Sequence, residues 1–350
     1  MRVWFSVLLI STGMSDSFPI PKIEYSPKTY VCYKTNFPIL VDGKLDDVTW
    51  AYVEWTDSFV DIEGALKPLP FFDTKVKMCW DENYFYFGAV MEEPHLWATL
   101  TARDAVIFRD NDFEIFLDPD GDTHHYYELE INAFETEWDL LVLKPYRDQG
   151  KVAVDSWDIP GLITEVHLDG SVNNPHDRDK LWSVEIAIPW KALEECAPNF
   201  HPIDGEQWKV NFSRVHWDLD ILENQYVKTG SPEYNWVWSP QGIINMHYPE
   251  MWGLVQFTHT MAGEEIIPFV DNQTDKLKWA LRQIYYRERS YYNHHERYTA
   301  SLKELELMDP PVEHIPWPPS ISITPSGWEA FVEWDGKWVF IRKDGKVWIE

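Results

Sequence analysis

Cysteine is scarce in this chain of 350 residues. The three cysteines are Cys32, Cys79 and Cys196, and their odd number leaves at least one thiol outside any disulfide. No two of them have the C-x-x-C spacing that is typical of structural zinc sites. We therefore expect neither a disulfide scaffold nor a zinc centre, and cysteine usage does not identify the compartment.

Basic residues are scarce as well. The chain has 30 Lys and Arg against 58 Asp and Glu, which gives a formal net charge of −28. A surface with this average charge repels phosphate polyanions, so nucleic acid and anionic membranes are poor partners for the protein.

Long apolar runs are missing outside the N-terminus. No other stretch approaches the roughly 18 apolar residues needed to cross a bilayer, so we expect no membrane span. Near the start, Arg2 precedes an apolar run from Val3 to Ile10, followed by small and polar residues. This pattern is typical of a weak signal peptide over residues 1–17 and predicts a secreted or periplasmic protein. A buried first strand is the alternative interpretation.

Aromatic residues, in contrast, are abundant. The chain contains 20 Trp, 17 Tyr and 18 Phe, together 16% of its residues. Most of these rings are expected in the core, because aromatic side chains bury large areas. The remainder can serve as platforms for a ligand, since flat rings stack on the apolar faces of sugars while acids and amides bond the hydroxyls.

Short runs of alternating apolar and polar residues dominate the first two-thirds of the chain. Residues 74–91 and 110–134 each read as two strands around a turn, at Asp81–Asn83 and at the "DPDGD" sequence of 118–122. Further strand patterns cover 181–190, 207–217 and 251–259. The sequence predicts a mainly β protein, an antiparallel β-sandwich of the jelly-roll or immunoglobulin-like kind over residues 25–260.

The pattern changes in the last third. Residues 274–308 form a predicted helical segment, with an amphipathic helix over 275–293 that Thr274 or Asp275 can cap and a second short helix near 299–307. A Pro-rich linker follows at 309–319. Asp-Gly pairs at 335–336 and 344–345 favour hairpin turns, so 320–350 is predicted to be a small three-strand β meander.

Five motifs occur in order at 41–50, 76–94, 110–122, 184–193 and 238–257. Together they make the chain similar to the family 9 carbohydrate-binding modules, a β-sandwich family related to the DOMON domains. The resemblance implies that a sugar lies between aromatic side chains, with carboxylate, amide or guanidinium groups at its hydroxyls. On this sequence the family's acid falls at Glu114, its first stacking aromatic at Phe108 and its arginine at Glu130. The second stacking tryptophan falls at Trp236 or Trp238.

The strand at 112–118 places its acids on one face. Glu114 shares a face with Asp112 and Phe116, and on the next strand Glu128, Glu130 and Asn132 share a face. If this polar face is concave, its acids and amide lie beside Trp138 and can bond several hydroxyls. The alternative is a solvated polar face, with Phe113, Ile115 and Leu117 in the core.

These patterns nominate a set of ligand-binding residues. The stacking candidates are Phe108, Trp138, Trp217, Trp236 and Trp238, and the hydroxyl partners are Glu114, Glu130 and Asn132. Arg109 and Arg214 are candidates for orienting the ligand, and a guanidinium in so acidic a chain favours an acidic sugar such as a uronic acid. The alternative role of these arginines is to form salt bridges with nearby acids.

Asp118, Asp120 and Asp122 alternate oxygen ligands in the way that calcium accepts, which suggests a structural calcium site. A plain tight turn is the alternative. Haem binding would need a Met or His pair as axial ligands. Met246 and His247 are adjacent and point opposite ways in an extended chain, and no C-x-x-C-H motif is present, so we expect no haem.

The sequence therefore predicts a protein that binds a mono-, oligo- or polysaccharide without catalysis. No nucleophile elbow, phosphate loop or zinc-helix motif is present in the sequence. A glycoside hydrolase using Glu114 and Glu130 is the second hypothesis, because two carboxylates on adjacent strands can act as an acid and nucleophile pair. A haem electron-transfer domain is the third.

Overall fold

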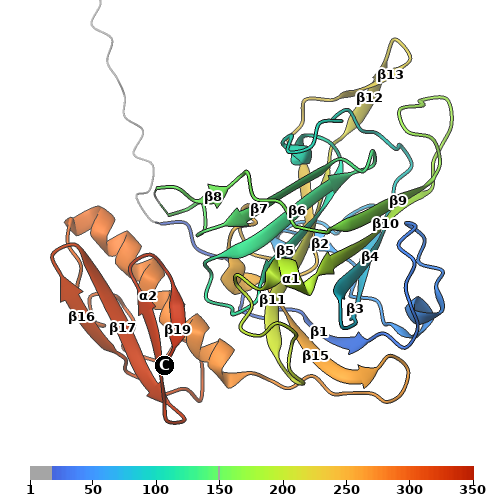
Figure 1. Ribbon diagram of the computed structural model, residues 1–350. Coiled ribbons are helices and arrows are strands. Elements are labelled where there is room, and N and C mark those ends of the chain that lie inside the picture. The colour runs from blue at the N-terminus through green and yellow to red at the C-terminus, as the bar shows by residue number, and fades with distance from the viewer. Residues whose placement is uncertain (1–17, 149) are drawn as a thin grey trace, which may run out of the picture. The chain divides into compact units, whose positions relative to one another are not determined.

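The structure is a computed structural model, and it describes residues 18–148 and 150–350. They form two compact units, one made of residues 21–271 and the other of residues 18–20 and 272–350 (Figure 1). The predicted signal peptide, residues 1–17, lies outside the described residues. Within the described ranges, no helix has both the length and the apolar character that crossing a membrane requires.

The larger unit is built almost entirely of β-strands. They are β1 (Thr29–Lys34), β2 (Val60–Asp61), β3 (Thr74–Trp80), β4 (Tyr84–Glu92), β5 (Asp112–Asp118), β6 (Tyr126–Asn132), β7 (Glu137–Val142), β8 (Ala153–Val154), β9 (Ile163–Asp169), β10 (Leu181–Pro189), β11 (Gln207–His216), β12 (Leu219–Leu222), β13 (Gln225–Lys228), β14 (Tyr234–Val237) and β15 (Gly253–Met261). The short helix α1 (Trp190–Leu193) and the 3-10 turns Val48–Tyr52, Gly64–Leu66, Ile107–Arg109 and Pro249–Met251 connect them.

Thirteen of these strands form one hydrogen-bonded network that folds over on itself. One half has the order β8-β7-β6-β5-β11, with β14 and β2 beyond β11, and the other has the order β15-β1-β3-β4-β10-β9. β11 joins the halves: Gln207–Val210 pair with β15, while Lys209–Ser213 pair with β5. The pairings are antiparallel except for β1, which runs parallel to both β15 and β3.

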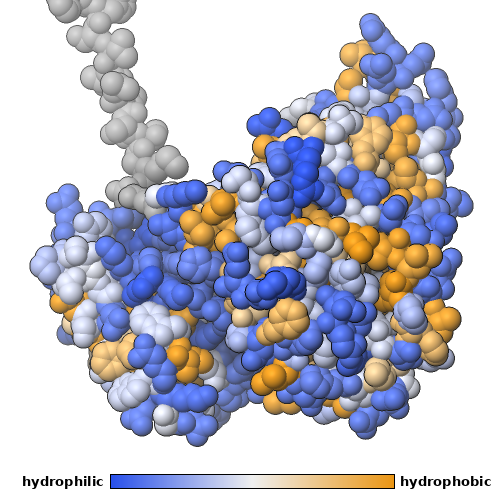
Figure 2. All heavy atoms as spheres, in the orientation of Figure 1, coloured by the Kyte–Doolittle hydropathy of each residue, from blue (hydrophilic) through white to orange (hydrophobic). Residues whose placement is uncertain are grey.

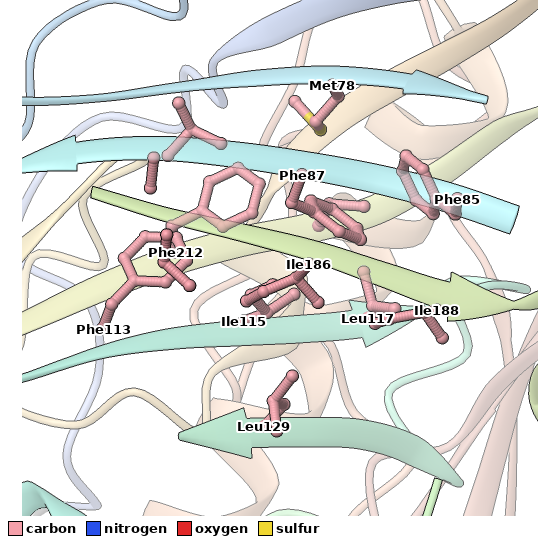
Figure 3. Packing of buried hydrophobic residues seen from close by; sticks show 14 of the residues in the cluster. Met78, Phe85, Phe87, Phe113, Ile115, Leu117, Leu129, Ile186, Ile188 and Phe212 are labelled. Atoms are coloured by element: carbon pink, nitrogen blue, oxygen red, sulfur yellow. The ribbon is translucent and has the colours of Figure 1, made fainter. Parts of the chain in front are cut away.

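The core lies between the two halves (Figure 3). Apolar side chains from both halves meet there and are at most 1% exposed: Phe113, Ile115, Leu117, Leu129 and Phe212 from one half, and Met78, Phe85, Phe87, Ile186 and Ile188 from the other. Each set comes from alternate positions along its strand, as a pleated strand requires. The predicted β-sandwich is confirmed.

Local sequence explains where these strands stop. Between β3 and β4, the Asp81 carboxylate accepts hydrogen bonds from the backbone N–H groups of Asn83 (2.7 Å) and Tyr84 (2.8 Å), which closes the turn. At the end of β10, Pro189 is the last strand residue and the N-cap of α1. Proline has no N–H to donate to a neighbouring strand, so the ladder ends there.

The smaller unit begins with α2 (Gln273–His295), which confirms the predicted long helix. The capping residue differs from the prediction: the side chain of Asn272 accepts from the N–H groups of Thr274 and Asp275. The second predicted helix, near 299–307, is wrong, because those residues form turns. After Glu296, in the left-handed region at φ 53°, the chain reverses, and the N–H of Thr299 bonds the Glu288 carboxylate instead of continuing a helix.

The C-terminal meander has four strands rather than the predicted three: β16 (Ser320–Thr324), β17 (Gly327–Trp334), β18 (Lys337–Arg342) and β19 (Val347–Ile349). The Asp-Gly turn at 335–336 forms as expected, with φ of 52° and 73°. The additional strand, β16, precedes a two-residue connection at Pro325–Ser326 that the Asp-Gly pattern does not mark. Figure 2 shows hydrophilic residues over much of the visible surface, with smaller hydrophobic patches among them.

Candidate functional site

The strand β5 carries two buried faces of opposite character. Phe113, Ile115 and Leu117 point into the core, while Asp112 and Glu114 lie on the other face. The register places Glu114 opposite Glu130 of β6. Both faces are buried. The alternative of a solvated polar face is therefore wrong, although the apolar face does lie in the core.

A pocket of about 610 Å³ covers the acidic face. Three glutamates from β5 and β6 line it together with aromatic residues and the segment 244–247; its main side chains are Glu114, Glu128, Glu130, Phe108, Phe116, Trp138, Tyr146 and His247. The rings of Phe108 and Trp138 have centroids 6.4 Å apart and are tilted by 33°. The space is large enough for a small ligand to lie against rings and carboxylates at once.

The three glutamates are almost fully withdrawn from solvent. Glu114, Glu128 and Glu130 are 4%, 5% and 1% exposed, and Asp112 beside them is 0% exposed. Burial raises the pKa of Glu114 to about 7. Burial, followed by repulsion from Glu114, holds the pKa of each of Asp112, Glu128 and Glu130 well above its usual range. No ion pair to these four acids is found among the described residues.

Five of the nominated ligand residues come together in this pocket: Phe108, Arg109, Glu114, Glu130 and Trp138 all line it. Their positions follow from the β5–β6–β7 register, because Glu130 lies opposite Glu114 on one side and Trp138 on the other. The 3-10 turn Ile107–Arg109 adds Phe108, whose N–H donates to Glu130 Oε2 at 2.9 Å.

Trp217 lies near the pocket without lining it. Its indole N–H donates to the Phe108 carbonyl at 3.0 Å, and the Lys228 ammonium lies 3.4 Å from the centroid of its ring. The Lys228 ammonium also donates to the Arg109 carbonyl. Trp217 therefore holds the Phe108–Arg109 turn in place, and Lys228 occupies one face of its ring.

Two nominated tryptophans lie outside the pocket. Trp238 is 1% exposed in the sandwich core, with its ring 5.9 Å from that of Phe212, so it has no free face for a ligand. Trp236 stacks on His216, with centroids 5.0 Å apart and an interplanar angle of 12°. It borders a neighbouring cavity of about 510 Å³, which Phe71 also lines.

Arg214 and Asn132 are structural in this arrangement. Arg214 is 1% exposed and pairs with the Glu93 carboxylate at 3.0 Å. Although burial opposes it, the hydrogen bond to His216 and the charge of Arg214 lower the pKa of Glu93. The Asn132 amide accepts from the N–H groups of Phe134 and Thr136 and donates to the Leu100 carbonyl. Neither side chain lines the pocket, and the salt-bridge alternative holds for Arg214.

The nominated set omits several pocket residues. Glu128 lies two positions before Glu130, and strand alternation alone places it on the same face. Tyr146 and His247 arrive from loops, for which the sequence pattern gives no signal. Burial, and then the charge of Arg147, lower the pKa of His247 to about 3, and its Nδ1 lies 2.8 Å from the Tyr126 hydroxyl.

The "DPDGD" turn brings its three aspartates together as its alternation suggests. Oxygens of Asp118, Asp120 and Asp122 lie within 4.8 Å of one another. The same carboxylates also close the turn, because Asp118 accepts from the N–H groups of Gly121 and Thr123. Tight-turn geometry is thus established, and calcium binding at these aspartates stays a prediction.

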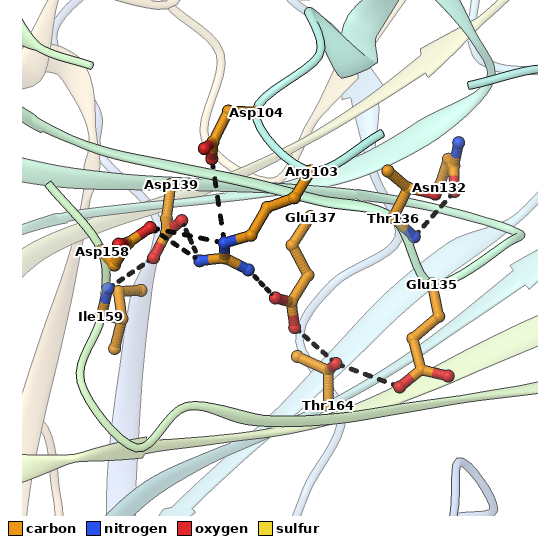
Figure 4. A network of polar contacts seen from close by, with 10 residues as sticks. All are labelled: Arg103, Asp104, Asn132, Glu135, Thr136, Glu137, Asp139, Asp158, Ile159 and Thr164. Carbon is orange, nitrogen blue, oxygen red and sulfur yellow. Dashed lines mark hydrogen bonds and ion pairs between the residues drawn. The ribbon is translucent and has the colours of Figure 1, made fainter. Parts of the chain in front are cut away.

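A second acidic cluster lies at the edge of the sandwich and has a cation at its centre (Figure 4). The Arg103 guanidinium contacts the carboxylates of Asp104, Glu137, Asp139 and Asp158. The Glu137 carboxylate also accepts from the Thr164 hydroxyl at 2.7 Å. Here each acid has a positive partner, unlike the acids of the pocket.

Comparison with solved structures finds similar chains of low sequence identity. A carbohydrate-binding module of family 9 from Caldicellulosiruptor kristjanssonii, solved with cellotriose, is 18% identical, covers 70% of this chain and 100% of its own, and has a TM-score of 0.44. A family 9 module from the same organism, solved with glucose, is 19% identical, with coverage of 69% of this chain and 100% of its own and a TM-score of 0.44. A Bacteroides uniformis protein described as carbohydrate-binding is 17% identical, with 66% and 100% coverage and a TM-score of 0.48.

No curated protein matches the chain at a significant level. A model of the family described as "Carbohydrate family 9 binding domain-like" matches residues 41–253, which is more than half of the chain. The matched range contains the pocket strands β5, β6 and β7. The chain therefore belongs to the carbohydrate family 9 binding domain-like family.

Proposed function

We propose that this protein binds a saccharide without catalysis, and that the sugar occupies the pocket over β5 and β6. The observation that carries the proposal is the convergence of Phe108 and Trp138 with Glu114 and Glu130 around one cavity of about 610 Å³. Rings and hydroxyl-bonding groups within reach of one small ligand are what sugar recognition needs. Membership in a family of carbohydrate-binding domains supports it independently.

Each side chain has a distinct role in this proposal. Phe108 is 39% exposed and Trp138 is partly buried, so both have ring surface that a sugar face can cover. Glu114 and Glu130 bond the sugar hydroxyls, and a carboxyl group with a raised pKa can donate as well as accept. Arg109 at the pocket wall adds guanidinium N–H donors.

The charge of the pocket favours an uncharged sugar over the acidic sugar suggested by the arginines. Of the two nominated arginines, Arg109 lines the pocket and Arg214 does not. Glu114, Glu128, Glu130 and Glu233 all line it. A uronic acid would place a further carboxylate beside four acidic side chains and a single arginine, so we propose a neutral mono- or oligosaccharide.

Binding is favoured over glycoside hydrolysis by the direction of the pKa shifts in the pocket. A retaining hydrolase needs one ionised carboxylate as nucleophile and one protonated carboxyl as acid. Here burial raises the pKa of Glu114, Glu128 and Glu130 alike, so the pocket does not show the contrast between two acids that such a pair needs. This agrees with a family of binding domains.

A secreted or periplasmic location fits this function, because polysaccharides are met outside the cytoplasm. The support is the signal-like pattern of residues 1–17 in the sequence. Calcium at Asp118, Asp120 and Asp122 would stiffen the β5–β6 turn, and the supporting observation is the proximity of their oxygens.

A glycan array probed with the full chain tests the proposal, using neutral and uronic-acid glycans side by side. The best ligand is then titrated by calorimetry into the wild type and Trp138→Ala. We expect Trp138→Ala to weaken binding by about 1–3 kcal/mol, as for aromatic anchors at binding surfaces. Trp338→Ala is the matched control, because Trp338 is an exposed tryptophan of the meander.

The outcomes separate the hypotheses. Equal affinity of the wild type and Trp138→Ala would remove the pocket as the site. Binding of uronic-acid glycans alone would contradict the proposed preference for a neutral sugar. Release of reducing sugar from a bound glycan, measured in parallel, would favour the hydrolase instead.

A further inference from the structure

The four acids of the pocket floor, Asp112, Glu114, Glu128 and Glu130, lack the compensation that buried acids normally have. Burying a charge is costly unless it is paired or hydrogen-bonded. Elsewhere in the larger unit, Glu93 has Arg214 and Asp139 has Arg103. The floor acids have no such basic partner within residues 18–148 and 150–350.

The Ser213 hydroxyl lies beside Glu114 and lowers its pKa, but three oxygens of this set have no hydrogen bond of good geometry in the described structure. They are Asp112 Oδ2, Glu114 Oε2 and Glu128 Oε2, and each is withdrawn from solvent. The residues themselves are 0%, 4% and 5% exposed. Unsatisfied buried acceptors are rare, because each has lost its hydrogen bonds to water without replacing them. Glu114 and Glu128 line the pocket and Asp112 does not, so two of the three oxygens belong to pocket residues.

The spacing of the oxygens suits a metal ion. One carboxylate oxygen from each of Asp112, Glu114 and Glu130 can be chosen so that all lie within 4.8 Å of one another. Oxygen ligands on opposite sides of a calcium ion are about 4.6–5.2 Å apart, twice the Ca–O distance, and adjacent ones are closer. Three carboxylates at this spacing therefore fit one coordination sphere.

The backbone holds these side chains in place before any ligand arrives. Asp112 Oδ1 accepts from the Val215 N–H at 3.1 Å, and Glu130 Oε2 accepts from the Phe108 N–H at 2.9 Å. Antiparallel pairing fixes Glu114 opposite Glu130. The cluster is thus positioned by β5, β6 and β11 together, and little ordering remains to be done on binding.

We infer that Asp112, Glu114 and Glu130 bind a divalent cation that prefers oxygen ligands, such as calcium, at the floor of the pocket, with Glu128 beside it. Carboxylate-only ligation suits calcium, magnesium and manganese rather than softer metals. The ion would neutralise the buried acids. This site is separate from the "DPDGD" turn, and the inference does not depend on saccharide binding.

Calorimetric titration of CaCl₂ into the full chain, freed of metal by chelation and dialysis, tests the inference. The wild type should bind calcium, and the double variant Glu114→Gln, Glu130→Gln should lose one site or bind it at least tenfold more weakly. Glutamine keeps the size of each side chain and removes like charges, so the variant should fold; circular dichroism checks this.

Asp120→Asn is the control that separates the two candidate sites. Asp120 belongs to the turn cluster and not to the pocket, so this variant should retain the calcium site that the double variant loses. A second readout is thermal: calcium should raise the melting temperature of the wild type, and raise it less in the double variant.

Two results would overturn the inference. One is a wild type that binds neither calcium nor manganese and whose melting temperature does not change when either metal is added. The other is equal calcium affinity in the wild type and the double variant, with loss of the site in Asp120→Asn instead. Saccharide titration with chelator present reports on the proposed function alone, so the two failures are distinguishable.

Discussion

The Arg103 cluster and the pocket floor contain the same kind of side chain in opposite circumstances. Around Arg103, four carboxylates share one guanidinium, and Asp139 among them is 0% exposed. At the pocket floor, four carboxylates that are each at most 5% exposed have no basic partner in the described structure, and three of their oxygens have no hydrogen bond of good geometry. Both clusters lie on the β5–β6–β7 side of the sandwich.

The difference separates acids that hold the fold from acids that are kept for a ligand. An ion pair with a buried partner stabilises the folded chain once its desolvation is offset by additional hydrogen bonds. A buried acid with no counter-charge lowers stability, and such groups gather at functional sites. The absence of a basic partner, more than burial itself, therefore identifies the site in this protein.

The largest expected effect is the loss of the central cation. Arg103→Met should leave Asp139 buried without its guanidinium partner, and we expect the free energy of unfolding to fall by about 3 kcal/mol, the lower end for breaking a buried pair because Arg103 is partly exposed. Urea unfolding followed by tryptophan fluorescence measures it. Lys191→Met, which removes an exposed pair with Glu194, is the control and should be nearly neutral. Equal stability of both variants would contradict the assignment of Arg103 to the scaffold.

A buried acid in the other unit tests whether the rule is general. Burial raises the pKa of Glu288, which has no ion pair in the described structure, to about 7. Its folded pKa lies above the unfolded value of about 4.5, so its contribution to stability is complete below pH 4.5 and is lost as the pH rises through 7. From pH 5 to 7 the loss should be about 2 kcal/mol.

Hydrogen exchange of the α2 amides against pH measures this loss locally. Glu288→Gln should flatten the pH dependence between pH 5 and 7, because the amide oxygen still accepts from the Thr299 N–H and has no proton to lose. A slope that survives in Glu288→Gln would assign the pH dependence to another group.

The smallest effect should have the opposite sign to that of Arg103→Met. Glu114→Gln, measured with chelator present, removes one of the like charges at the pocket floor, and we expect stability to rise by about 1 kcal/mol. The same unfolding assay applies. A destabilised Glu114→Gln would mean that Glu114 has a structural partner, and the comparison of the two clusters would fail.

Much of the fold could be predicted from the sequence because strand alternation and turn chemistry are local. The β3–β4 and β5–β6 hairpins, β10, β11, β15 and α2 all occur where their patterns indicate. The helix near 299–307 fails because the Thr299 N–H donates to the Glu288 carboxylate, a contact that helical spacing does not reveal.

The site could be predicted only in part, for a reason that alternation makes clear. Period-two spacing shows that Glu114 and Glu130 share a face, but it cannot show that both faces of β5 are covered. Trp238 fails as a stacking residue because spacing from the family motif cannot tell core from pocket. Tyr146 and His247 reach the pocket on loops, which carry no periodic signal.

One strand has a consequence for how the larger unit comes apart. β11 pairs with β15 near its start and with β5 and β14 further along, so it belongs to both layers of the sandwich. Neither layer can separate from the other without breaking the hydrogen bonds along β11. The pocket floor and the opposite layer should thus unfold together as one cooperative unit. A ligand bound against β5 would also stabilise strands with which it makes no contact.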